Sequence, residues 1–304
     1  MTKRALLPYL SILFCSLTLS AQSVDQNPDI DNKFLMSFST GLQSQNFNWS
    51  IAGNRAGQSP NILSELKWQN LKIVILGLTV DYTINPKLIL HSDYQGGQVF
   101  IGKVSDIDYQ GDNRSQEIYN SLFDSDKGSQ NIFNVSVSYR ILSCRWLQLA
   151  LSTGYVCNIQ HYFLLDHQGI YDANLNSTYT GIWQGIKTGA TGNILLTRRL
   201  TANVFCAYSR INFRANGNWN LISDFEHPVS YKHNATGFTL DPAIKLNYSL
   251  CQFWSLYLTG RSGIWQTGNG TDVLYLTNGE KPQTQLNGVN FNYYYMGIGF
   301  QWNL

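Results

Sequence analysis

Apolar and polar residues alternate along most of the chain, and the pattern is clearest near the C-terminus. Between Tyr293 and Leu304, one set of alternate positions is wholly apolar or aromatic, and the other holds small and polar side chains. Because successive side chains of a β-strand point to opposite faces, this segment is predicted to be a strand with one face toward lipid and the other toward a polar lumen. A strand of a soluble β-sandwich is the alternative interpretation.

Similar runs earlier in the chain bring the predicted strands to ten. They are Phe34–Leu42, Leu66–Thr83, Leu88–Gly102, Asn131–Leu142, Trp146–Leu165, Tyr179–Thr197, Leu200–Ala215, Tyr231–Ser249, Phe253–Gly270 and Val289–Leu304. Short turns join them at one end and long polar connections at the other, which is the asymmetry of outer-membrane barrels. The long connections are Gln43–Glu65, Ser105–Gln130, Asp166–Ser177, Asn216–Ser230 and Thr271–Asn287. The sequence therefore predicts an all-β fold, a ten-stranded antiparallel transmembrane β-barrel with long extracellular loops.

Residues 1–21 have the features of a secretory signal peptide. A positively charged start precedes the mostly apolar run Leu6–Leu19, and the small residues Ser20 and Ala21 suit cleavage. A membrane-anchoring helix is the alternative, but the run is shorter than the roughly 20 apolar residues that cross a bilayer. We therefore expect an exported protein in which residues 22–304 form a single barrel domain.

The composition favours a membrane barrel over a soluble secreted protein. The chain holds 18 Tyr, 15 Phe and 8 Trp residues, yet only 13% of its residues are charged, and its mean hydropathy is -0.18. In a membrane barrel only alternate residues face lipid, so mean hydropathy stays modest while aromatic residues form girdles at the interfaces. We expect a monomeric barrel in the outer membrane of a Gram-negative bacterium, with membrane lipid as a partner.

Charge and cysteine spacing indicate no cofactor, no metal and no nucleic-acid partner. The net charge is +2, and the sequence has no basic groove with interleaved stacking residues. Beyond the signal peptide the cysteines have no CxxC or metal-ligand spacing, and export permits disulfides that the sequence does not pair. These cysteines are Cys144, Cys157, Cys206 and Cys251.

Asp106 and Asp108, in the second long connection, are the first candidates for chemistry. In extended backbone, residues two apart point the same way, so their carboxylates would share one small volume and push their pKa values apart. One could then accept a proton from a water while the other holds that water in place. A solvated surface turn is the alternative interpretation, because D-x-D sequences are common there.

His227, in the fourth long connection, is the second candidate. It follows Asp224 and Glu226 closely, and a histidine beside carboxylates can act as a general base at neutral pH. The alternative is a solvated loop histidine without a catalytic role.

The layout of residues 22–304 resembles the omptin family, outer-membrane endopeptidases of Gram-negative bacteria. Four local segments carry the resemblance: Ser64-Glu65-Leu66-Lys67-Trp68, Asp106-Ile107-Asp108-Tyr109, Thr153-Gly154-Tyr155 and Glu226-His227. The resemblance implies a ten-stranded barrel that cleaves surface peptides or proteins as an aspartic-type endopeptidase. It implies a water activated between an Asp pair and an Asp–His dyad. Asp106 and Asp108 would then be the pair and His227 the base, oriented by Asp224 or Glu226.

Three departures from the omptin pattern affect these expectations. Phe225 stands two residues before the histidine, where the family has the dyad aspartate. The first loop has the uncharged Asn48 and Trp49 near the family's basic-substrate acid, which puts a preference for Arg or Lys in doubt. Of the family's lipopolysaccharide contacts Tyr155 matches, but Cys157 and Ile159 do not, so lipid activation is not implied.

Two functions therefore remain open from the sequence. The first is an omptin-like endopeptidase of altered specificity. The second is a catalytically inactive barrel that acts as a surface adhesin or binding protein through aromatic loops containing Trp49, Tyr109 and Trp219. A transport pore is a weaker third hypothesis, because the interior of a barrel of about ten strands is narrow enough for side chains to fill.

Overall fold

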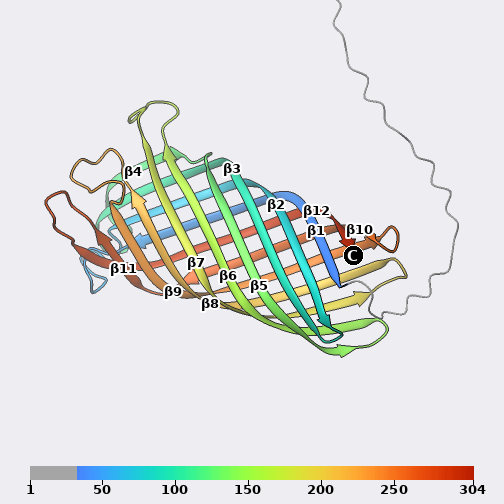
Figure 1. Cartoon of the computed structure of the whole chain (residues 1–304). Coiled ribbons are helices and arrows are strands. Elements are labelled where there is room, and N and C mark those ends of the chain that lie inside the picture. The colour runs from blue at the N-terminus through green and yellow to red at the C-terminus, as the bar shows by residue number, and fades with distance from the viewer. Residues whose placement is uncertain (1–32) are drawn as a thin grey trace, which may run out of the picture. The chain divides into compact units, whose positions relative to one another are not determined.

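The computed structural model describes residues 33–304, and the predicted signal peptide, residues 1–21, lies outside them. The described residues form an antiparallel ring of strands (Figure 1). The strands are β1 (Phe34–Ile51), β2 (Ser64–Asn85), β3 (Leu88–Gly111), β4 (Ser115–Asp124), β5 (Gly128–Ser143), β6 (Leu147–Leu165), β7 (Asn176–Leu195), β8 (Leu200–Asn218), β9 (Tyr231–Ser249), β10 (Trp254–Thr267), β11 (Gly270–Leu274) and β12 (Gln283–Asn303). A single 3-10 turn, η1 (Asp112–Arg114), connects β3 to β4.

The strands occupy ten positions in the ring. β4 and β5 pair with successive parts of β3, and they share one position between β3 and β6. β10 and β11 likewise share the position between β9 and β12. Pairing of β1 with β12 closes the barrel. The predicted ten-stranded antiparallel fold is therefore confirmed.

Short turns connect the strands at one end of the barrel, called here the turn end, as the sequence predicts. The turn between β2 and β3 is held by the side chain of Asn85, which accepts hydrogen bonds from the backbone of Lys87 and Leu88. Two of the other turns close with backbone hydrogen bonds from Cys144 to Leu147 and from Leu250 to Trp254. In Figure 1 this is the end where the C-terminus lies, and β4 and β11 mark the opposite, loop end.

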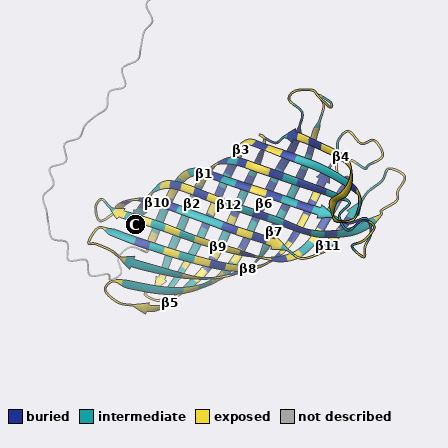
Figure 2. Ribbon diagram, turned by 180° about the vertical axis from the view of Figure 1, so that it is seen from behind, coloured by how far each residue is buried: buried dark blue, intermediate teal, exposed yellow. Residues whose placement is uncertain are grey.

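A band of exposed apolar side chains surrounds the part of the barrel nearer the turns. In Figure 2 exposed residues alternate with intermediate or buried ones along the strands, as expected for a wall with lipid on one side and a lumen on the other. On the loop side this band ends at the exposed apolar side chains Leu42, Val74, Ile101, Phe133, Ile159, Ile186, Tyr208, Phe238, Ile264 and Tyr294. Residues beyond them toward the loops lie outside the lipid-facing band.

The lumen above the middle of the barrel is filled by a cluster of aromatic side chains. Phe47, Trp68 and Trp183 have no exposed surface, and Phe47 contacts both tryptophans with ring centroids 5.5 and 6.5 Å apart. Tyr162 and Tyr179 complete this layer from β6 and β7. This aromatic plug leaves no open channel along the barrel axis at that level.

Several strands extend further toward the loops than the alternation predicts. β1 continues from Leu42 to Ile51, within a predicted loop, because its polar residues also face the lumen. There Gln43 donates hydrogen bonds to Gln45 and Gln130, and Gln45 donates to Tyr162. Residues 43–46 are polar on both faces, and beyond them Phe47 and Trp49 put the apolar side chains on the lumen face, so the lipid-facing alternation stops at Leu42.

The second predicted loop, 105–130, is mostly strand. Its first residues continue β3 to Gly111, and β4 returns beside them before a short break at 125–127. The third predicted loop corresponds to residues 166–175 between β6 and β7, and the fourth to residues 219–230 between β8 and β9. The fifth contains β11, which pairs with both β9 and β12.

All four cysteines of the described chain are free: Cys144, Cys157, Cys206 and Cys251. Among residues 33–304, no helix is long and apolar enough to cross a membrane.

Candidate functional site at the barrel mouth

Asp106 and Asp108 lie near the loop end of β3, beyond the lipid-facing band. Asp106 stands directly opposite Leu66 of β2, whose fully buried side chain belongs to the lumen cluster. Asp108 is two residues further along the strand, so both carboxyl groups project from the lumen face. The sequence placed this pair in a loop, whereas the structure places it on a strand paired on both sides.

The carboxyl group of Asp106 has one oxygen that is sealed from solvent and unpartnered. Its Oδ1 makes no hydrogen bond within the protein, although the residue as a whole is half-buried. Burial, together with the nearby charge of Asp108, raises the pKa of Asp106 to about 8. Burial also raises the pKa of Asp108, in spite of a hydrogen bond with Ser64. At neutral pH the Asp106–Asp108 pair therefore holds a proton.

His227 lies in the fourth loop and is bound by Asn218, the last residue of β8. Its Nδ1 is 2.8 Å from Asn218 Oδ1. Because an amide oxygen only accepts hydrogen bonds, Nδ1 carries the proton in this contact, and Nε2 of the neutral ring keeps its lone pair. Among the described residues, no hydrogen bond or ion pair joins His227 to Asp224 or Glu226, the acids expected to orient it.

Backbone contacts hold the fourth loop against the fifth. Phe225 forms an isolated β-bridge with Leu276, and Thr277 donates a backbone hydrogen bond to the Asp224 carbonyl at 3.0 Å. The backbone amide of Glu226 also donates to a carbonyl of the fifth loop, at 2.9 Å. Phe225, at the position of the omptin dyad aspartate, therefore helps to hold the fourth loop, which carries His227, against the fifth loop.

A second histidine, His233 on β9, forms a buried cluster. Its side chain has no exposed surface, and its Nδ1 is 2.9 Å from the hydroxyl of Tyr179. Its Nε2 lies 3.1 Å from Asp272 Oδ1, within ion-pair distance but out of line for a hydrogen bond. Thr284 donates to the other oxygen of Asp272 at 3.0 Å. Sequence reasoning missed this histidine–acid pair because only the pairing of β9 with β11 brings the two residues together.

The acid pair and His233 lie on opposite walls of the barrel mouth. Four strand positions separate β3 from β9 in either direction around the ring. The ring of Tyr231 lies beside His233, with centroids 5.1 Å apart. Burial raises the pKa of Tyr231 well above its usual value, and nearby Tyr179 and the charges of Asp106 and Asp272 raise it further. The phenol of Tyr231 is therefore close enough to interact electrostatically with acids on both walls, Asp106 and Asp272.

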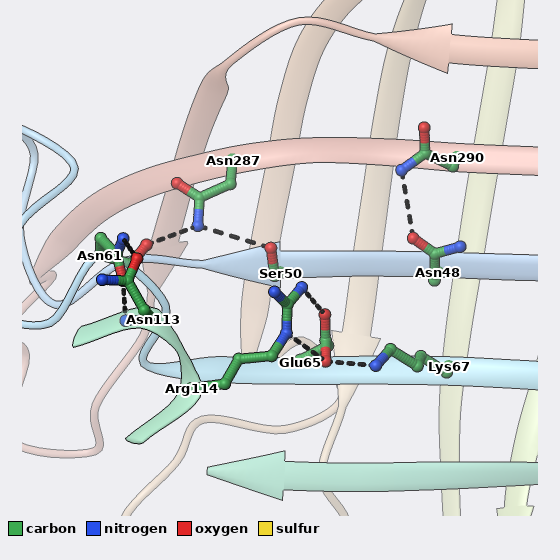
Figure 3. A network of polar contacts seen from close by, with 9 residues as sticks. All are labelled: Asn48, Ser50, Asn61, Glu65, Lys67, Asn113, Arg114, Asn287 and Asn290. Carbon is green, nitrogen blue, oxygen red and sulfur yellow. Dashed lines mark hydrogen bonds and ion pairs between the residues drawn. The ribbon is translucent and has the colours of Figure 1, made fainter. Parts of the chain in front are cut away.

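An ion cluster around Glu65 anchors the turn between β3 and β4 (Figure 3). Arg114 donates to both oxygens of Glu65, at 3.2 and 2.7 Å, and Lys67 Nζ lies 2.5 Å from Glu65 Oε1. Burial alone would raise the pKa of Glu65, but hydrogen bonds from Arg114 and Lys67 outweigh it and hold that pKa below its usual value. Arg114 belongs to the same hairpin as the acid pair, so this cluster fixes the strand that carries the two aspartates.

Asparagine side chains extend this network over the first loop, residues 52–63 (Figure 3). Asn61 and Asn113 exchange two hydrogen bonds, at 3.0 and 2.8 Å. Asn287 donates to the Asn61 carbonyl at 2.9 Å, and Asn290 donates to Asn48 at 3.1 Å. The first loop, the β3–β4 turn and β12 are therefore held together.

Hydrogen bonds join successive extracellular loops, and a contact between the first loop and the start of β12 completes a closed rim. The joining pairs, taken around the barrel, are Asn61–Asp112, Asp126–His167, Asn174–Asn220, Asp224–Thr277 and Asn54–Gln285. The candidate residues are thus carried by a rim whose parts support one another.

The acid pair and His227 each carry groups for acid–base chemistry, and among the described residues no hydrogen bond or ion pair joins His227 to Asp106 or Asp108. The acid pair can bind and polarise a water, and Nε2 of His227 can accept a proton. Within residues 33–304, no group of three or more His, Cys, Asp or Glu side chains is placed to hold a metal ion.

The closed antiparallel ring, the lipid-facing band and the filled lumen define a β-barrel protein of the outer membrane. Residues 37–304 match the family described as Protochlamydia outer membrane protein, or Pom. The chain belongs to the Pom family, which confirms the predicted location in the outer membrane. No curated protein matches the sequence.

Solved structures place the fold beside that of the omptins. The crystal structure of outer membrane protease OmpT from Escherichia coli aligns with a TM-score of 0.71 and 15% sequence identity, over 90% of this chain and 97% of that one. At this identity the likeness establishes the fold. The translocator domain of autotransporter NalP from Neisseria meningitidis gives a TM-score of 0.42 at 9% identity, over 91% and 90% of the two chains.

Proposed function

We propose that this barrel is an omptin-like endopeptidase, which cleaves peptide bonds at the cell surface with a water activated by Asp106, Asp108 and His227. The observation that carries the proposal is the unpartnered Oδ1 of Asp106 beside a second carboxyl group. Buried polar atoms in folded proteins are nearly always hydrogen-bonded. An acid that lacks a partner at the mouth of a barrel therefore suits a water or a substrate group.

The Asp106–Asp108 pair binds the water and supplies the shared proton. The protonated carboxyl group donates a hydrogen bond to the carbonyl oxygen of the peptide, while the ionised one accepts a hydrogen bond from the water. The raised pKa of Asp106, about 8, keeps this proton in place at neutral pH.

His227 accepts the proton that the water loses. Asn218 takes the part that an aspartate has in the omptin dyad: it holds the ring and keeps the proton on Nδ1, which leaves Nε2 free. The side chains of Asp224 and Glu226 have no direct part in this mechanism. His233 is excluded as the base because it is buried and both of its ring nitrogens lie beside Tyr179 or Asp272.

The loop end of β1 favours substrates other than basic ones. The amide of Asn48 is bound by Asn290, and the indole of Trp49 is buried against His233, with ring centroids 4.8 Å apart. Since neither side chain offers a carboxylate, cleavage next to uncharged residues is expected in preference to Arg or Lys.

Cleavage of a peptide library by the purified barrel, refolded in lipid vesicles, tests the proposal by mass spectrometry. Asp106→Ala and His227→Ala are expected to lower the rate by roughly 10²–10⁴-fold, the usual contribution of a general acid or base. Glu280→Ala changes an exposed loop residue and is expected to leave the rate unchanged. A correctly folded native barrel that cleaves no peptide in the library would overturn the proposal.

The absence of a carboxylate partner for His227 supports one alternative, a surface-binding barrel without peptidase activity. Under this alternative, shortening the loops abolishes binding to host glycans or proteins, while His227→Ala leaves that binding intact. The peptide library and a surface-binding assay on the same His227→Ala barrel separate the two functions.

A further inference from the structure

The β3–β4 hairpin leaves one edge of β4 unpaired at the loop end of the barrel. β4 pairs with β3 along its length, but with β6 only at Asp124, opposite Leu165. In the described part of the chain, no backbone hydrogen bond connects residues 115–123 to any strand other than β3. The backbone N–H and C=O groups on that edge are therefore free to pair with another extended chain.

Exposure of β4 shows that nothing in the described chain covers this edge. Residues 115–120 are exposed without interruption, so both faces of the ribbon meet solvent there. Ile118 and Leu122 are 62% and 58% exposed, although both are apolar and lie beyond the lipid-facing band. Only the base of the notch between β4 and the third loop is closed, where the rings of Phe123 and Tyr171 lie 4.9 Å apart.

The free edge lies one strand away from the acid pair. In the β3–β4 register Asp106 is opposite Ser121 and Asp108 is opposite Tyr119. Neighbouring strands are about 4.8 Å apart, so a strand added to β4 would lie about 10 Å from β3. A chain paired with β4 is thus too far for its own backbone to be cut, but a few further residues reach the barrel mouth.

We propose that the free edge of β4 binds an extended segment of the polypeptide substrate by strand addition. Backbone hydrogen bonds to residues 115–123 supply affinity with little dependence on sequence, and Ile118 and Leu122 contact apolar side chains of the added strand. The segment beyond the paired one then enters the mouth beside Asp106 and Asp108. This inference rests on the proposed peptidase function and extends it to the substrate's conformation.

A substrate segment explains the position of this edge better than a second copy of the barrel does. Natural proteins normally protect open edges with bulges, prolines, inward charges or a covering loop. Here a bulge at Ile118 and a left-handed backbone at Gln116 interrupt the start of the edge, but its regular part, 119–123, stays open and stands next to the candidate site. Pairing of the β4 edges of two barrels would not involve the nearby acid pair.

Binding is tested on the Asp106→Asn barrel, refolded in vesicles, so that cleavage cannot confuse the measurement. The probe is a fluorescein-labelled ten-residue peptide of alternating Val and Thr, and its control is the same peptide N-methylated at every inner residue. Hydrogen exchange of backbone amides, followed by mass spectrometry, is expected to slow within 115–123 when the first peptide is added. The N-methylated peptide is expected to leave that exchange unchanged.

Paired variants test the edge itself. Ile118→Lys with Leu122→Lys is expected to weaken binding of the Val-Thr peptide about tenfold or more, because edge lysines oppose strand addition. Ile170→Lys with Leu221→Lys adds the same charge to exposed apolar residues of other loops and should change binding less than about twofold.

Three results would overturn the inference. The first is an unchanged exchange rate at 115–123 when the Val-Thr peptide is bound, and the second is equal weakening of peptide binding by both lysine pairs. The third is slower exchange at 115–123 that depends on the concentration of the barrel and not on that of the peptide. Each is separate from the peptidase question. Cleavage without protection of β4 would leave the proposed function standing, and protection without cleavage by the native barrel would leave the docking edge standing.

Discussion

At the scale of single residues, the barrel wall changes the acid–base behaviour of Asp106. A solvated aspartate ionises near pH 4, whereas burial and the charge of Asp108 raise the pKa of Asp106 to about 8. The folded barrel therefore binds this proton more tightly than the unfolded chain does. It follows that the contribution of Asp106 to stability falls as pH rises from about 4 to about 8.

We predict that the Asp106→Asn barrel is more stable than the native one at pH 9 and that this difference disappears below about pH 4. At pH 9 the native protein holds a charged carboxylate with an unpartnered oxygen, and relief of such a group is worth on the order of 2 kcal/mol. Below about pH 4 the aspartate is neutral in both the folded and the unfolded protein. Urea titration of tryptophan fluorescence in vesicles measures the difference, with Glu280→Gln as the control. Equal midpoints at pH 9 would contradict the raised pKa.

The buried cluster of His233 gives a second prediction at this scale. Asp272→Ala removes the carboxylate beside the buried ring of His233 and leaves the hydroxyl of Thr284 without its acceptor. The free energy of unfolding is expected to fall by about 2–4 kcal/mol. Urea titration checks this, and Glu280→Ala, a change to an exposed acid of the fifth loop, is expected to cost less. An unchanged free energy of unfolding in Asp272→Ala would show that the cluster adds nothing to stability.

The sequence made some of these residues visible and hid others. Asp106 and Asp108 stand two apart, so a strand-like period alone predicts that they share a face. Asn218 and His227 meet only because the loop after β8 folds back on the strand end, and no spacing rule gives that contact. His233 and Asp272 meet through the register of β9 and β11, and β11 is too short to produce a recognisable alternation.

At the scale of elements, the β3–β4 hairpin carries both the acid pair and the free edge. Its turn is held from outside by the contacts of Arg114 and Lys67 with the buried carboxylate of Glu65. Because the pKa of Glu65 is held below its usual value, this contribution is present above about pH 4.5 and is lost as pH falls through the lowered pKa.

We predict that Arg114→Ala loosens the hairpin without unfolding the barrel. The change leaves Glu65 buried with Lys67 alone, and hydrogen exchange at 109–120 is expected to rise at least about fivefold, equivalent to a local cost of about 1 kcal/mol. Exchange in β8 and β9 should stay the same. Lys103→Ala breaks a more exposed ion pair with Asp124 and serves as the control. An unchanged exchange rate at 109–120 in Arg114→Ala would show that the contact with Glu65 does not anchor the hairpin.

Strands in the lipid-facing band were the easiest elements to predict, because lipid on one face requires an apolar residue at every second position. Above the band the outer face meets water instead of lipid, so this requirement disappears, although the lumen face still carries buried aromatic side chains such as Phe47. That is why β1 was predicted to end at Leu42 and why β4 was taken for a loop. Its residues 115–120 are all exposed and therefore show no alternation between a wet face and a dry one.

At the scale of the whole molecule, the barrel is closed both along its axis and around its mouth. The aromatic plug of Phe47, Trp68, Tyr162, Tyr179 and Trp183 fills the lumen, and the five joining pairs complete the rim. A filled lumen agrees with either proposed surface function and disfavours a solute channel.

We predict that the native barrel does not conduct ions in a planar lipid bilayer. The triple variant Phe47→Ala, Trp68→Ala and Trp183→Ala removes three large rings from one level of the lumen, and it is expected to produce measurable conductance. Met296→Ala, on the lipid-facing side, should remain closed. Steady conductance by the native protein would contradict a filled lumen, whereas a closed triple variant would show that other side chains suffice to block it.

The closed rim has a consequence for how such a surface can diversify. Every loop is bonded to two neighbours, so a change in the length of one loop disturbs two seams at once. Exchange of a single loop between relatives would leave both seams mismatched. New specificities in this barrel should therefore arise by replacing individual side chains while the lengths of the loops stay the same. Transplanting a loop should succeed only when the adjoining loops are moved with it.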